Sequence, residues 1–112
     1  MNERDNLPNR RKNLTLTFAY PPDSQASGMI FTATVGFYDD GRLGELFLHA
    51  GKSEQAMESI SRDLAVVTSL ALQYGAPVKT IEGALTKLSD GRPAGPLGIL
   101  FGEIGRGVAA WP

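Results

Sequence analysis

The alternation of apolar and polar residues predicts β-strands in the first half of the chain. Over residues 13–20 every second residue is apolar, which is typical of a strand with one buried face. The same pattern returns over residues 29–37. Asp39, Asp40 and Gly41 then predict a hairpin turn, since glycine can adopt the positive φ that such turns need. We expect a third strand over residues 42–50.

The spacing of apolar residues changes after residue 50 and predicts a long helix. It should begin near Ser53, whose hydroxyl can accept a hydrogen bond from a first-turn N–H, and end at Gly75. Intervals of three and four predict a buried face made by Ala56, Ile60, Leu64, Val67, Ala71 and Tyr74. Over residues 64–72 the other faces are apolar too, so we expect this half to be buried on several sides.

Two further helices follow in the prediction. The second opens at Ala76–Pro77, where the missing N–H of proline costs nothing, and buries Val78, Ile81, Leu85 and Leu88. A short third helix over residues 96–104 is weakened by Gly98 and Gly102. This order predicts an α+β fold, in which a three-stranded antiparallel sheet is followed by two main helices and a short third helix on one sheet face.

The chain is long enough for one compact domain. We expect residues 1–12 to be a flexible basic arm, residues 13–104 the single α+β domain and residues 105–112 a C-terminal tail. A three-stranded sheet leaves two edges and one open face. Dimerisation through either would protect it.

Composition narrows the classes of function. The net charge of −1 argues against binding to nucleic acid or to an anionic membrane. No apolar run approaches the roughly 20 residues that span a bilayer, and the first residues do not resemble a secretory signal. We therefore expect a cytoplasmic protein. With no cysteine and one histidine, the chain cannot form a cysteine-based metal site, and we expect neither metal nor cofactor.

Six residues are candidates for contact with an anion or a partner. Arg10, Arg11 and Lys12 form a basic cluster that can touch phosphate or an acidic surface, or can simply be solvated. Lys52 and Ser53 follow a glycine as in a phosphate-binding loop, but the glycine needed earlier in that motif is a leucine here. A strand-to-helix turn explains them, and a weak anion site at the helix start remains open. Trp111 either docks on a partner or folds back on the domain.

No residue is predicted to be catalytic. Asp39 and Asp40 are interpreted as turn residues rather than as a metal pair. The serines of the long helix have no histidine at a suggestive spacing, so a hydrolase triad has no support. A small enzyme built around Lys52, His49 and Glu45 stays as a third alternative.

Four segments in order resemble one known family. They are residues 7–12 (LPNRRK), 39–47 (DDGRLGELF), 69–77 (SLALQYGAP) and 94–98 (AGPLG). Together they resemble the TSCPD domain, the small C-terminal domain of adenosylcobalamin-dependent (class II) ribonucleotide reductases. The Thr-Ser-Cys-Pro-Asp string that names the domain is missing, and residues 93–97 stand in its region.

The resemblance implies a fold and a partner, and no catalytic residue. In these reductases the reaction uses a thiyl radical and further cysteines in a large barrel domain, whereas this chain has no cysteine. The chain should therefore be a stand-alone, non-catalytic accessory module. It would bind another protein, a second copy of itself as a homodimer, or a nucleotide. The alternative is a small inhibitor or decoy that competes for a docking surface.

Overall fold

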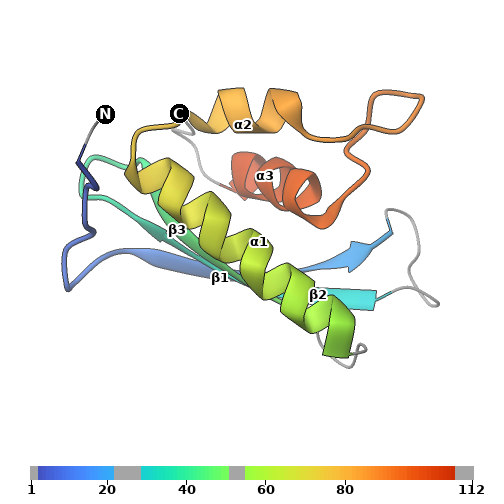
Figure 1. Ribbon diagram of the computed structural model, residues 1–112, viewed down its shortest axis with the longest axis horizontal. Helices are drawn as coiled ribbons and strands as arrows, with labels where there is room; N and C mark the ends of the chain where they lie inside the picture. Colours follow the sequence, from blue (N-terminus) through green and yellow to red (C-terminus); the bar gives the residue numbers. More distant parts are fainter. Residues whose placement is uncertain (1–2, 22–28, 51–54, 108–112) are drawn as a thin grey trace.

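The computed structural model describes residues 3–21, 29–50 and 55–107. Figure 1 shows three strands followed by three helices, so the predicted α+β fold is confirmed. The elements are β1 (Asn13–Tyr20), β2 (Met29–Phe37), β3 (Leu43–His49), α1 (Gln55–Gln73), α2 (Val78–Ala84) and α3 (Pro96–Gly107). No helix in these described ranges is long and apolar enough to cross a membrane.

The sheet has the order β1-β2-β3 and both pairs are antiparallel. β1 and β2 have the predicted bounds, and β3 is one residue shorter than predicted at each end. The register shifts near the turn, because Gly36 pairs with Glu45 while Phe37 pairs with Leu43. The shift turns Leu43 into the core, whereas Glu45, Phe47 and His49 share the opposite face.

The core lies on one face of the sheet. Phe18, Phe31, Val35 and Leu46 contribute side chains from the three strands. The helix α3, predicted to be weak, supplies Leu97, Leu100, Phe101 and Ile104 to the same core and continues to Gly107. The helix α1 packs on the same face through Ala65 and Leu72. The other sheet face, called here the open face, carries no helix among the described residues.

The prediction for the buried face of α1 is wrong. Ile60, Val67 and Tyr74 are exposed. The residues that are buried are Ser61, Ala65, Thr68, Leu72 and Gln73. The side of α1 that faces the core therefore carries smaller and more polar residues than the exposed side.

The helix α2 is shorter than predicted. It ends at Ala84, and Leu85 follows in an extended conformation. Leu88 lies beyond the helix and is 36% exposed, so it does not belong to a buried stripe. Val78 is the residue of α2 that is fully buried. Pro77 precedes the helix as its N-cap residue rather than lying within the first turn.

Candidate functional site

The helix α1 lies along the outer edge of β3 and bonds to its backbone. The Ser69 hydroxyl accepts a hydrogen bond from the Leu46 N–H at 2.9 Å and donates to the Leu46 carbonyl at 3.1 Å. The Gln73 amide donates to the Gly44 carbonyl at 2.9 Å. An unpaired strand edge invites pairing with another chain, and buried backbone groups need partners. These side chains therefore satisfy the backbone groups of Leu46 and the Gly44 carbonyl from within the molecule.

Glu58 continues this edge contact near the start of α1. Its carboxylate accepts a hydrogen bond from the Ala50 N–H at 2.9 Å and lies 2.8 Å from His49 Nδ1. The bond from Ala50, followed by the contact with His49, lowers the pKa of Glu58 below its ordinary value. Glu58 is therefore a carboxylate at neutral pH and already has its partners.

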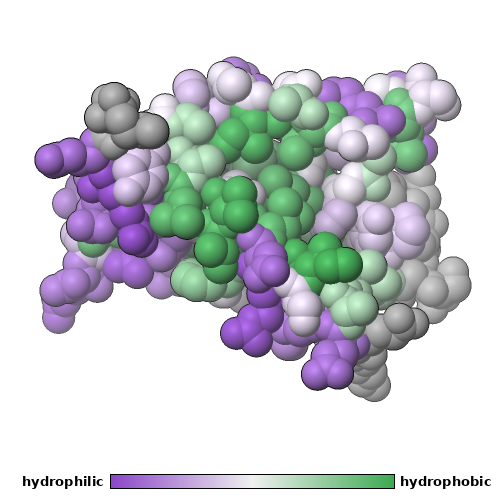
Figure 2. Space-filling view, viewed as in Figure 1, coloured by the Kyte–Doolittle hydropathy of each residue, from purple (hydrophilic) through white to green (hydrophobic). Residues whose placement is uncertain are grey.

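Five large apolar side chains of α1 are exposed on the side away from the core. Their relative exposures run from 37% for Leu70 to 65% for Val67. The set, called here the outer face of α1, is Ile60, Val66, Val67, Leu70 and Tyr74. Figure 2 shows hydrophobic residues gathered over α1 and the helices beside it. Contiguous apolar surface of this kind marks interaction sites in soluble proteins.

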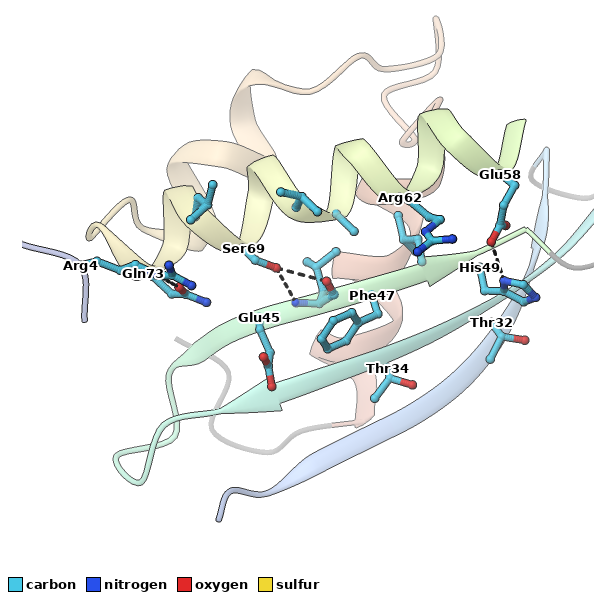
Figure 3. A pocket seen from close by; sticks show the side chains of 15 residues that line it. Arg4, Thr32, Thr34, Glu45, Phe47, His49, Glu58, Arg62, Ser69 and Gln73 are labelled. Atoms are coloured by element: carbon cyan, nitrogen blue, oxygen red, sulfur yellow. Dashed lines mark hydrogen bonds and ion pairs between the residues drawn. The ribbon is translucent and has the colours of Figure 1, made fainter. Parts of the chain in front are cut away.

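A groove of about 800 Å³ separates α1 from the open face of the sheet. In Figure 3, Phe47 stands on the open face beside Thr34, and the helix forms the opposite wall. Phe47 is 58% exposed, and Val66 and Leu70 line the groove with it. The groove and the outer face of α1 therefore share residues and form one continuous apolar surface.

Charged residues lie at both ends of this groove, which is called here the α1–sheet groove (Figure 3). At one end Arg4 donates to the neutral Gln73 side chain at 2.6 Å. At the other end Arg62 reaches from α1 toward the sheet and makes no hydrogen bond or ion pair with any described residue. Glu45 is paired with Arg11 at 2.6 Å, whereas Glu58 contacts His49, which is charged only if protonated, and lies within the electrostatic reach of Arg62. With Glu45 and Arg11 taken as a pair, Arg4 and Arg62 face the one carboxylate of Glu58, so the net charge of the groove is positive.

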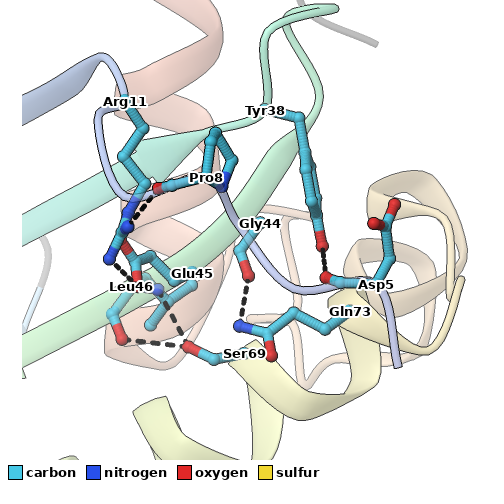
Figure 4. A network of polar contacts seen from close by, with 9 residues as sticks. All are labelled: Asp5, Pro8, Arg11, Tyr38, Gly44, Glu45, Leu46, Ser69 and Gln73. Carbon is cyan, nitrogen blue, oxygen red and sulfur yellow. Dashed lines mark hydrogen bonds and ion pairs between the residues drawn. The ribbon is translucent and has the colours of Figure 1, made fainter. Parts of the chain in front are cut away.

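The described part of the predicted basic arm, residues 3–12, contacts the domain (Figure 4). The Asp5 N–H donates to the Gln73 carbonyl at 2.8 Å, and the Tyr38 hydroxyl donates to the Asp5 carbonyl. Burial, followed by the charge of Asp5, raises the pKa of Tyr38, so the hydroxyl keeps its proton. Arg11 bonds both the Pro8 carbonyl and Glu45. The flexibility of the arm stays a prediction, but these contacts place it against α1 and β3.

Two glycines make room for these contacts. A Cβ built on Gly36 would overlap the Glu45 side chain, so the missing side chain lets Glu45 reach across β2 to Arg11. A Cβ on Gly44 would lie 2.6 Å from the Tyr38 ring and 2.8 Å from Leu7. Both positions therefore tie the N-terminal segment to the sheet.

The six residues predicted to contact an anion or a partner differ in where the structure places them. Arg11 is held in the ion pair with Glu45, whereas Arg10 and Lys12 are exposed. Lys52, Ser53 and Trp111 lie outside the described residues. His49 and Glu45 are four residues apart on β3 and each has its own partner, so the geometry assembles no acid–base pair from them. Within the described ranges, no group of three or more acidic or histidine side chains could hold a metal ion.

Sequence reasoning did not find Phe47 or the outer face of α1 as surface features. A signal was present, because residues 64–72 are apolar on all sides of the helix. A helix that is apolar all round needs cover on every side. In the part of the chain that the structure describes, one side of α1 is buried and the large apolar residues of the other side are exposed.

The chain resembles parts of much larger proteins. The vitamin B12-dependent ribonucleotide reductase of Bradyrhizobium diazoefficiens is 37% identical over 97 residues, which is 87% of this chain and 7% of that protein. The enzyme of the same name from Agrobacterium fabrum is 33% identical over 83% of this chain, and that from Rhodopirellula baltica is 33% identical over 70%. The chain spans about 7% of the length of each of these relatives.

No solved structure matches the chain. The family model of the TSCPD domain matches residues 8–108, a range that includes all three strands and all three helices. Of the four segments quoted from the sequence, residues 7–12 precede β1, and the others fall on the β2–β3 turn with β3, the end of α1 and the start of α3. The chain belongs to the TSCPD domain family.

Proposed function

We propose that this chain is a non-catalytic binding module that docks on another protein through the outer face of α1. One observation carries the proposal: large apolar residues of α1 are exposed while Ser61 and Thr68, on the same helix, are buried. Exposing Val67 and Ile60 to water is unfavourable, and a partner that covers them recovers about 25 cal/mol for each Å² removed from water. Apolar and aromatic residues of this kind form the centres of protein interfaces.

The proposed partner is the polypeptide of a vitamin B12-dependent ribonucleotide reductase. The relatives carry a segment similar to this chain as about 7% of their length. A copy of such a segment would act on the reductase by occupying or stabilising a surface. It supplies no thiol for radical chemistry, since the chain contains no cysteine.

The test is binding to the purified reductase of the same cell, measured by calorimetry. The double variant Ile60→Gln/Val67→Gln changes no charge, and glutamine is a good helix former at exposed positions. The free energy of unfolding should therefore change by no more than about 0.5 kcal/mol. Its affinity should fall about 30-fold or more, as expected when central interface contacts are lost. The matched control is Thr80→Gln/Thr86→Gln, which alters exposed threonines away from α1 and should bind normally.

Equal binding by the wild type and the α1 double variant would refute the proposal. If the wild type does not bind the reductase, sedimentation at rising concentration decides the partner. A dimer that the α1 double variant cannot form would assign the surface to a second copy of this chain. No association of either kind would refute a docking role for α1.

A further inference from the structure

We propose that the α1–sheet groove binds an acidic, amphipathic segment of the partner protein, apolar in its middle and carrying carboxylates toward both ends. This inference rests on the proposed function and names the chemistry of the partner. It follows from the lining of the groove and from the balance of its charges.

The middle of the groove fits apolar side chains. The Phe47 ring lies on the sheet side, and Val66 and Leu70 line the groove from α1. Aromatic and aliphatic side chains seated between them would be removed from water on two sides. The Thr32 and Thr34 hydroxyls also line the groove and can bond to the backbone of an extended segment.

The ends of the groove fit carboxylates. Arg62 makes no hydrogen bond or ion pair with a described residue, although its charge acts on Glu58, and Arg4 is bonded to a neutral amide. Glu45 is neutralised by Arg11, which leaves one carboxylate, that of Glu58, against the two arginines, so the net charge of the groove is positive. An incoming cation would therefore meet uncompensated positive charge, whereas a carboxylate would find a guanidinium that matches it with two parallel hydrogen bonds.

The spacing of the two arginines sets the length of the segment. Arg62 and Gln73, to which Arg4 is bonded, are eleven residues apart on α1. Eleven residues of α-helix span about 16 Å. An extended chain covers that distance in about five residues. The carboxylates of the partner should therefore lie about five residues apart, with apolar residues between them.

The experiment is selection of random 12-residue peptides displayed on phage against the full chain. Recovered peptides should carry Asp or Glu on both sides of aromatic or aliphatic residues. The strongest recovered peptide, labelled with fluorescein, should bind Arg62→Gln about tenfold more weakly than wild type at low salt. The loss should shrink as salt rises, because salt screens exposed charges. Arg10→Gln, which removes an exposed cation outside the groove, is the control and should leave binding unchanged.

Recovery of no peptide, of peptides without acidic residues, or of peptides indifferent to Arg62→Gln would overturn the inference. Thermal stabilisation by ATP that is lost in Arg62→Gln would also overturn it and assign the groove to a phosphate ligand. The two proposals fail separately. Reductase binding that is lost in Ile60→Gln/Val67→Gln but normal in Arg62→Gln would leave the docking role intact and remove the groove inference alone.

Discussion

The two long sides of α1 differ in a way that inverts the usual pattern of a surface helix. The buried side carries Ser61, Ala65 and Thr68, with Leu72 as its large apolar residue, whereas the exposed side carries the large apolar residues of the outer face. The reason is where the helix lies. It packs against the edge of β3, where backbone groups need hydrogen-bonding side chains and close approach favours small ones. The apolar residues that remain can be buried by a partner.

The largest expected effect on stability is the difference between alanine substitutions at two leucines of α1. Leu72→Ala removes a side chain that is 5% exposed and should cost about 2–5 kcal/mol of unfolding free energy, since it leaves a cavity in the core. Leu70→Ala removes one that is 37% exposed and should cost about 1 kcal/mol or less. Urea unfolding measures both. Equal losses would show that the two sides of α1 do not differ as described.

The next effect concerns the bonds between α1 and the edge of β3. Ser69→Ala leaves the Leu46 N–H and carbonyl without their side-chain partner and should cost about 1–3 kcal/mol in urea unfolding. The matched control is Ser59→Ala on the exposed side, which should change stability by no more than about 0.5 kcal/mol. A neutral Ser69→Ala would mean that the edge of β3 does not depend on α1 for its hydrogen bonds.

A smaller effect tests the link between the sheet and the N-terminal segment. Gly36→Ala pushes Glu45 away from Arg11, and the loss of this half-buried ion pair should cost about 1 kcal/mol. Hydrogen exchange at the Asp5 amide should become faster, because the segment is held less firmly. Gly83→Ala, where a new Cβ meets nothing within 4 Å, is the control and should leave that exchange rate unchanged.

The smallest effect is a dependence on pH. Because the pKa of Glu58 is lowered in the folded protein, its contribution to stability is fully present above its ordinary value of about 4.5 and is lost as pH falls through the lowered value. Urea midpoints measured from pH 7 to pH 3 should therefore fall less steeply for Glu58→Gln than for wild type. Parallel curves for the two proteins would contradict the role given to the Ala50 and His49 contacts.

The strands and turns could be predicted from the sequence because each depends on residues that are close together along the chain. Alternation set the bounds of β1 and β2, and the turn predicted at Asp39-Asp40-Gly41 formed, with Gly41 at φ 93°. The residue types of Asp40, Gly41 and Arg42 recur at Asp90-Gly91-Arg92, and the structure repeats the turn, with Gly91 at φ 92° and the Arg92 N–H bonded to Asp90. The repeated residues could have identified this second turn from the sequence.

The spacing of apolar residues could not predict which side of α1 faces the sheet. Apolar residues occur on both sides of this helix, so spacing alone could not say which side meets the sheet. The choice depends on Ser69 and Gln73, whose bonds to β3 become visible only once the strand edge is placed. The roles of Gly36 and Gly44 likewise depend on register, because their close neighbours are distant in sequence.

The most direct test of the central claim is the rate at which a single thiol on α1 is labelled. The chain contains no cysteine, so Val67→Cys carries one thiol on the outer face and Leu72→Cys carries one on the buried side. Labelling of Val67→Cys in the free protein should be at least about tenfold faster than that of Leu72→Cys and should slow by a similar factor when the reductase is bound. Val67→Cys labelling as slow as that of Leu72→Cys in dilute free protein, or unchanged in the complex, would contradict the claim that this exposed face is where the partner binds.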